Sequence, residues 1–316
     1  MSPPARAGSP EPIRRTAEIE EITNLYFIHP VASRLVPLAA RMGLTPNALT
    51  LAGLLFGALA GFAYYRYQDP RFAVAGFVLM IGWHIMDGAD GQLARLTHSQ
   101  SHFGKVLDGI SDTATFLAVY TALALALGRK YGGGAYALVI VAAACHAVQS
   151  ATYEARRQEY ELWGWGRKSA EPQPSAATAR GGSRAGAGRA HASPLERLID
   201  FLLRLFYLWL SFPAADITGK TRASMAAALD RQPESAAFIR ERYRQSFAPL
   251  VRSWSVLSAN YRTLGIFVCV LFAVPAYYFW FEILGFSTVL AVLIASEYAC
   301  YRRLVVQLGA VNAALP

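Results

Sequence analysis

Residues 86–116, MDGADGQLARLTHSQSHFGKVLDGISDTATF, place four aspartates between two strongly apolar segments. These aspartates are Asp87, Asp90, Asp108 and Asp112. The whole chain is 54% hydrophobic and only 16% charged, whereas soluble domains are about 25% charged. Such a composition is typical of an integral membrane protein. Ionisable groups are costly to bury in lipid, so the four carboxylates are candidate functional groups.

The apolar residues form six segments of about the 20 residues that a helix needs to cross a bilayer. These segments are roughly residues 48–67, 71–90, 105–127, 133–153, 262–283 and 285–305. Small residues recur in the first of them, as at Gly53, Gly57 and Gly61, and small residues let membrane helices approach closely. The sequence therefore predicts an all-α membrane protein of about six transmembrane helices.

The segments between and around these spans are predicted to lie outside the bilayer core. Residues 17–44 read as an amphipathic interfacial helix, in which Pro30 and Pro37 are potential break points. The remaining predicted divisions are a disordered N-terminus at 1–16, a membrane domain at 45–155 and 262–306, a cytoplasmic insertion at 156–261 with a disordered linker at 169–194, and a C-terminal tail at 307–316. Within the insertion, residues 195–212 are apolar but interrupted by charges, which favours an interfacial helix and leaves a seventh span as the alternative.

The net charge of +9 bears on orientation and partners. Segment 154–261 carries sixteen of the thirty Lys and Arg residues, and cytoplasmic loops are the basic ones in membrane proteins. We therefore predict that both termini and the acidic site face the cytoplasm, in a bacterial inner membrane. Nucleic acid is not an expected partner, because the basic residues alternate with long apolar runs.

Helix geometry indicates that the four aspartates converge. Asp87 and Asp90 are spaced i,i+3 at the end of the second span, and Asp108 and Asp112 are spaced i,i+4 at the start of the third, so each pair shares a helix face. The short connection between them lets the two helices pack antiparallel. Four carboxylates in one cavity need cations to stay ionised. Oxygen ligands in this number suit Mg²⁺, Mn²⁺ or Ca²⁺.

The residues around the aspartates favour a phosphorylated ligand. Gly88, Gly91, Ala94 and Gly104 remove bulk, which lets a nucleotide or diphosphate approach the helices. Arg95 lies one turn beyond Gly91 and can add a phosphate contact. Two divalent ions held by shared carboxylates form a clamp for phosphoryl chemistry.

Written with its spacings, the stretch from Asp87 to Asp112 reads D-x2-D-G-x2-A-R-x8-G-x3-D-x3-D. This pattern resembles the signature of the CDP-alcohol phosphotransferase (CDP-alcohol phosphatidyltransferase) family at every fixed position. The six-span layout and the TPNALT segment at residues 45–50 resemble the family as well. The resemblance covers about residues 17–155, extends to the last two spans by hydropathy alone, and does not cover the insertion.

The resemblance implies a membrane enzyme that transfers a substituted phosphate from a CDP-linked donor to an alcohol and releases CMP. By position, Asp87 and Asp108 would bridge two divalent ions, usually Mg²⁺ with Mn²⁺ as an alternative. Asp90 would hold one ion and Asp112 the other, and Asp112 would also be the general base on the acceptor hydroxyl.

The same resemblance assigns a donor pocket and partners. Gly91, Arg95 and Ser101 would contact the CDP group, with Asn47 and Thr50 lining the pocket. The small residues Ala94 and Gly104 belong to the same predicted pocket. CDP-diacylglycerol is the expected donor, with a CDP-choline-type donor and a lipid alcohol acceptor as the alternative. The acceptor alcohol is left open, and the family implies a homodimer.

Other functions predict different patterns. A cation-coupled transporter would spread its acids along several helices, whereas here they cluster at one end of two. A membrane prenyltransferase would need a second aspartate-rich motif on a distant helix. Purely structural aspartates would need more basic partners than the single arginine of the motif.

A separate hypothesis concerns the end of the fourth span. Gln149, Tyr153, Arg156 and Arg157 are predicted near its cytoplasmic end, where they can bind an acceptor or a lipid phosphate. The alternative is that the two arginines only anchor the span on the cytoplasmic side.

Overall fold

The computed structural model describes residues 18–166 and 236–314. The predicted disordered N-terminus, the linker at 169–194 and the apolar segment at 195–212 lie outside the described residues. Within the described ranges the chain is helical and contains no strand.

Six helical stretches in the described ranges are long and apolar enough to cross a membrane. They are Pro46–Tyr65, Pro70–Leu96, Phe103–Tyr131, Gly133–Trp165, Ala236–Leu271 and Pro275–Leu304. The chain is thus an all-α integral membrane protein, which confirms the predicted fold class, and its described residues contain the six predicted spans.

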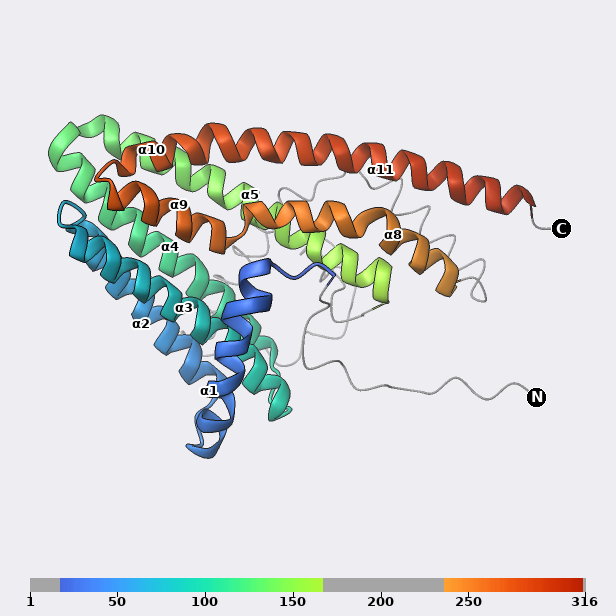
Figure 1. Cartoon of the computed structure of the whole chain (residues 1–316), viewed down its shortest axis with the longest axis horizontal. Coiled ribbons are helices and arrows are strands. Elements are labelled where there is room, and N and C mark those ends of the chain that lie inside the picture. Colours follow the sequence, from blue (N-terminus) through green and yellow to red (C-terminus); the bar gives the residue numbers. More distant parts are fainter. Residues whose placement is uncertain (1–17, 167–235, 315–316) are drawn as a thin grey trace, which may run out of the picture. The chain divides into compact units, whose positions relative to one another are not determined.

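The chain divides into two compact units, and the first contains the aspartate motif. Its described residues are 18–66 and 71–122. Its described helices are a π-helical turn at Asn24–Ile28, α1 at His29–Arg41, α2 at Pro46–Tyr65, α3 at Pro70–Leu96 and the first part of α4, which runs from His102 to Tyr131 (Figure 1).

Glycines let α2 approach both neighbouring helices of this unit. A Cβ added to Gly57 would stand 2.4 Å from Oγ1 of Thr115 on α4, and one added to Gly61 would stand 2.9 Å from the carbonyl oxygen of Ala118. At Gly53 the nearest atom is Cβ of Met86 on α3, 3.3 Å away. The small residues of the first span therefore bring α2 against the two helices that carry the aspartates.

Helix α1 packs on the same group of helices. Its apolar face joins a buried cluster with residues of α2 and α3, made of Ala32, Val36, Ala39, Leu49, Ala89 and Leu93. Pro37 lies inside α1 without ending it, since the helix continues to Arg41. The predicted amphipathic helix is present, and its placement in the membrane interface stays a prediction.

The described residues of the second unit are 67–70, 123–166 and 236–314. Its described elements after α4 are α5 at Gly133–Trp165, α8 at Ala236–Trp254, a 3-10 turn at Ser255–Leu257, α9 at Ala259–Leu271, α10 at Pro275–Trp280, a π-helical segment at Phe281–Phe286 and α11 at Ser287–Ala314 (Figure 1). Helix α8 packs against both α5 and α11.

The turn between the last two spans differs from the sequence prediction. Hydropathy placed it near residue 284, but the chain turns between Leu271 and Pro275. Pro275 occupies the first turn of α10, where a missing N–H costs nothing. Ala273 has a φ of 58° in the turn itself. The fifth apolar stretch, Ala236–Leu271, instead includes α8, which the sequence assigned to the insertion.

Two arginines of α8 bind the end of α5. Arg240 donates hydrogen bonds to the carbonyls of Leu162 and Trp163 at 2.9 and 3.0 Å, and Arg244 donates to that of Gly164 at 3.1 Å. The last carbonyls of a helix have no partner within the helix. Side chains of α8 therefore satisfy the C-terminal end of α5.

A buried polar network joins four elements of the second unit. Arg262 on α9 and Glu282 are both fully buried and form an ion pair of 3.2 Å. Arg262 also donates to Gln149 on α5 at 2.7 Å, and Tyr278 on α10 donates to Glu282 at 2.5 Å. Gln149 in turn donates to the carbonyl of Glu282 at 3.1 Å. Every charge in this network is therefore paired.

Candidate functional site

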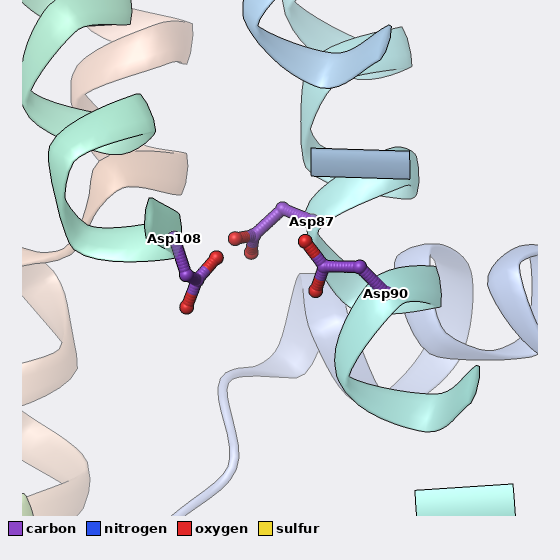
Figure 2. A group of neighbouring side chains, drawn as sticks. All are labelled: Asp87, Asp90 and Asp108. Atoms are coloured by element: carbon purple, nitrogen blue, oxygen red, sulfur yellow. The ribbon is translucent and has the colours of Figure 1, made fainter. Parts of the chain in front are cut away.

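The end of α3 and the beginning of α4 bring three aspartates together. One carboxylate oxygen from each of Asp87, Asp90 and Asp108 lies within 4.8 Å of the other two. Figure 2 shows Asp87 and Asp90 projecting from α3 toward Asp108 on α4. The predicted convergence of the two halves of the motif is observed for these three residues.

These carboxylates fit a divalent cation. Asp90 is buried, with 6% of its surface exposed. Oδ1 of Asp108 is also buried and accepts no hydrogen bond from the described residues. Three carboxylate oxygens this close repel one another unless a positive charge lies among them. Carboxylate oxygens are the ligands that Mg²⁺, Mn²⁺ and Ca²⁺ prefer, so the donor set suits one of these ions.

Asp112 lies one turn after Asp108 on α4 and is half-buried. It shares a helix face with Asp108 but is outside the group of three whose oxygens lie within 4.8 Å. Its position one turn along α4 places it beside Asp108, next to the group of three.

The N-termini of α2 and α4 meet close to these aspartates. Thr45 caps α2 by accepting a hydrogen bond of 3.2 Å from the N–H of Ala48, and Ser101 caps α4 by accepting one of 2.9 Å from that of Gly104. Oδ1 of Asn47 lies 3.5 Å from the position of a Cβ on Gly104. Helix N-termini carry a partial positive charge, so this arrangement favours an anionic ligand.

Gly91, within α3, has space beside it. A Cβ there would meet only the guanidinium group of Arg95, at an ordinary contact distance of 3.5 Å. Alanine is more favourable than glycine inside a helix, and packing among the described residues does not exclude it. A ligand that approaches the helix backbone next to Arg95 is a physical reason for a glycine here.

Thr50 makes a contact that the sequence did not indicate. It was predicted to line the donor pocket, but its hydroxyl lies 2.5 Å from Oδ2 of Asp90, forty residues away in the chain. Ser111, which was not predicted as a site residue, donates a hydrogen bond of 3.4 Å to the carbonyl of Thr50. Both contacts depend on how α2 packs against α3 and α4, for which the local sequence carries no signal.

The arginines at the end of α5 are engaged in internal ion pairs. Arg156 is 7% exposed, and its guanidinium lies 2.8 Å from Glu297 and 3.2 Å from Glu159. Arg157 lies 2.6 Å from Glu154. These pairings do not favour the hypothesis that the two arginines bind an acceptor or lipid phosphate.

Comparison with known proteins gives a family for the segment that contains this site. Residues 43–178 match the family model described as CDP-alcohol phosphatidyltransferase. This match confirms the family that the aspartate motif predicted.

Two curated relatives are similar over part of the chain. An archaetidylinositol phosphate synthase of Pyrococcus horikoshii is 36% identical over 86 residues, which are 27% of this chain and 44% of the relative. A CDP-diacylglycerol–serine O-phosphatidyltransferase of Helicobacter pylori is 36% identical over 73 residues, which are 23% of this chain and 29% of the relative. The chain thus spans less than half the length of either relative. With the motif, its geometry and the family model in agreement, residues 43–178 form a domain of the CDP-alcohol phosphatidyltransferase family.

Proposed function

We propose that this chain is a membrane enzyme of phospholipid synthesis that transfers a substituted phosphate from a CDP-linked donor to an alcohol, with release of CMP. The observation that carries the proposal is the convergence of Asp87, Asp90 and Asp108 within a segment that matches the family. Clustered carboxylates at the ends of two helices fit phosphoryl chemistry better than an ion path along several helices. This arrangement favours the enzyme over the cation-coupled transporter.

The aspartates are the proposed metal ligands. Asp87, Asp90 and Asp108 hold divalent cations through the oxygens that face one another, and Asp112 adds a fourth carboxylate one turn further along α4. We propose two ions, Mg²⁺ or Mn²⁺. Divalent ions bound there would neutralise the diphosphate of the donor and stabilise the CMP leaving group.

Asp112 is the proposed general base. An alcohol is a poor nucleophile at neutral pH, and a carboxylate within hydrogen-bond reach can take its proton during attack. Asp112 lies one turn after Asp108 on α4, so its carboxylate can act beside the proposed metal ligands.

The donor is proposed to bind where α2, α3 and α4 come together. Asn47, Ser101 and Gly104 lie at the two helix N-termini, whose partial positive charge suits a diphosphate. On α3, Arg95 supplies a cation for the phosphates, and the small residues Gly91 and Ala94 allow the donor to approach the helix.

The proposed donor is CDP-diacylglycerol. The name of the Helicobacter relative contains this donor, with serine as the acceptor, and the Pyrococcus relative is named for an inositol phosphate lipid. A CDP-choline-type donor with a lipid alcohol is the second candidate. We also propose that the site faces the cytoplasm and that the protein forms a homodimer, as the family resemblance implies.

The test is CMP release by the purified full chain in detergent with Mg²⁺. CDP-diacylglycerol is offered with a panel of alcohols that includes serine, inositol phosphate and glycerol phosphate, and CDP-choline is offered with diacylglycerol. Asp112→Asn serves as the inactive variant, and Asp69→Asn, at an exposed acid outside the motif, is the matched control.

We expect CMP release that depends on Mg²⁺, on one donor–acceptor pair and on Asp112, with the Asp69 variant as active as the parent protein. Release of CMP from no pair, together with no binding of a CDP-linked donor, would overturn the proposal.

A further inference from the structure

Thr50 lies where α2 meets both halves of the aspartate motif. Its side chain is buried, with 5% exposed, and its hydroxyl lies 2.5 Å from Oδ2 of Asp90 on α3. Its carbonyl accepts a hydrogen bond of 3.4 Å from Ser111 on α4. Since Ser111 lies between Asp108 and Asp112 in the chain, one residue of α2 contacts both helices that carry the aspartates.

The Thr50 hydroxyl has two acceptors within reach. One is Oδ2 of Asp90, and the other is the carbonyl of Pro46 at 3.2 Å, four residues earlier in the same helix. A hydroxyl has one proton to donate. A hydrogen bond to an ionised carboxylate is shorter and stronger than one to a neutral carbonyl. The proton is therefore donated to Asp90, and the bond to Pro46 is the weaker alternative.

We infer that Thr50 is a positioning residue that orients Asp90 for metal binding. Its hydrogen bond to Oδ2 holds the carboxylate in one orientation and so fixes the direction in which Asp90 presents its oxygens to a cation. This inference rests on the proposed function, because it takes Asp90 to be a metal ligand. Groups that hydrogen-bond to a metal ligand fix its orientation, and their loss typically costs about 10–100-fold in metal affinity.

The packing of α2 makes this orientation rigid. A Cβ on Gly57, two turns after Thr50, would stand 2.4 Å from Thr115 of α4, so the two helices are in close contact there. The Ser111 hydrogen bond adds a second link to α4 at Thr50 itself. A metal-binding side chain keeps its geometry better when the residue that orients it lies on a rigid helix than when that residue lies on a loop.

This role differs in its consequences from a direct contact with the donor. If Thr50 only lined the donor pocket, removing its hydroxyl would weaken donor binding and leave metal affinity unchanged. If Thr50 orients Asp90, removing its hydroxyl lowers metal affinity even when no nucleotide is present. The two roles are therefore separated by a metal titration without donor.

The test is a titration of the purified full chain in detergent with Mn²⁺ alone, with free Mn²⁺ measured by electron paramagnetic resonance. Thr50→Val keeps the shape of the side chain and removes the donor, and we expect Mn²⁺ to bind about 10-fold or more weakly. Thr50→Ser keeps the hydroxyl and should restore most of the affinity. Thr113→Val is the matched control, because Thr113 is exposed and its hydroxyl donates to the carbonyl of Gly109 in its own helix, at 2.9 Å.

A second measurement uses Asp90→Asn as background. If Thr50 acts through Asp90, Thr50→Val should cause much less additional loss of Mn²⁺ affinity in that background than in the parent protein. Should Thr50→Val not fold, Thr50→Ala replaces it with the same expectation. Thermal unfolding in detergent identifies variants that have lost their fold.

The outcomes distinguish this inference from the proposed function. Equal Mn²⁺ affinity of the Thr50→Val and parent proteins would overturn the inference alone, provided that the parent binds Mn²⁺ and releases CMP. A Thr50→Ser protein as weak as Thr50→Val would also overturn it, since the hydroxyl would not be the group responsible. A parent protein that binds no Mn²⁺ but releases CMP would overturn the inference alone. A parent protein that binds neither Mn²⁺ nor a CDP-linked donor and releases no CMP would overturn both proposals.

Discussion

Gly57 and Gly91 are both helical glycines near the aspartates, but their surroundings differ. A Cβ on Gly57 would stand 2.4 Å from Oγ1 of Thr115, whereas one on Gly91 would stand 3.5 Å from the Arg95 guanidinium. We expect Gly57→Ala to destabilise the protein by about 1–3 kcal/mol through overpacking. Gly91→Ala should keep the parent stability and weaken binding of the CDP-linked donor.

Thermal unfolding in detergent and donor binding by calorimetry measure the two effects on both variants. A Gly91→Ala protein that binds donor as the parent does would show that the space beside this glycine is not used by the donor.

Asp108 is the residue whose loss should affect metal binding most directly. Its buried Oδ1 accepts no hydrogen bond from the described residues. A bound cation would satisfy this oxygen. Asp108→Asn keeps the shape and removes the charge. We expect Mn²⁺ affinity to fall by more than the roughly 10–100-fold typical of a group that only supports a ligand, as measured in the same titration. Unchanged affinity would mean that Asp108 is not a ligand.

The spacing of the aspartates was sufficient to predict which of them share a helix face, because helical periodicity is a local property. It was not sufficient to find the contacts of Thr50 and Ser111. Those contacts depend on the distance and rotation between α2, α3 and α4. Such packing is set by contacts like that of Gly57 with Thr115, between residues far apart in the chain.

Among the elements, α8 is the one whose role the sequence did not show. Its hydropathy is mixed, so it was read as part of an insertion, yet Arg240 and Arg244 bind the C-terminal carbonyls of α5. Residues 262–283 also form one continuous apolar segment in the sequence, so hydropathy did not indicate the turn before Pro275. A window average detects apolar length but does not register a proline or a backbone turn inside it.

The contact between α8 and α5 can be tested by truncating its arginines. In Arg240→Ala/Arg244→Ala, the carbonyls of Leu162, Trp163 and Gly164 lose their side-chain donors. We expect faster amide hydrogen exchange in the last turns of α5, while the aspartate-bearing ends of α3 and α4 exchange as in the parent. Arg242→Ala, at an exposed position of the same helix, is the control. Equal exchange at the end of α5 in both proteins would contradict this role.

The ion pair between Arg262 and Glu282 holds α9 to the π-helical segment. Both side chains are fully buried, and breaking a buried pair by removing one partner costs about 3–5 kcal/mol. We therefore expect Glu282→Ala to give little folded protein by size-exclusion chromatography in detergent. The double variant Arg262→Met/Glu282→Leu should recover much of the loss, because no buried charge is left unpaired. A single variant as stable as the parent would show that the pair contributes little.

For the whole molecule, the ends of the described parts on either side of residues 167–235 lie close together. A Cβ on Gly166 would stand 2.9 Å from Cζ of Arg240, which is one helical turn from the start of α8. A Gly/Ser linker of about eight residues reaches roughly 15 Å on average. We expect a protein with this linker in place of 167–235 to fold and to bind Mn²⁺ like the parent. Loss of Mn²⁺ binding would show that the replaced segment supports the metal site.

The Arg262–Glu282 pair also has a consequence for biogenesis. The two residues lie on consecutive helical stretches that are each long enough to cross a membrane, with the turn before Pro275 between them. During synthesis, Arg262 emerges from the ribosome before Glu282 does, and an unpaired arginine is poorly accepted by lipid. We therefore expect the translocon to release these two spans into the bilayer together, as a helical hairpin, and to retain the first until the second has emerged from the ribosome.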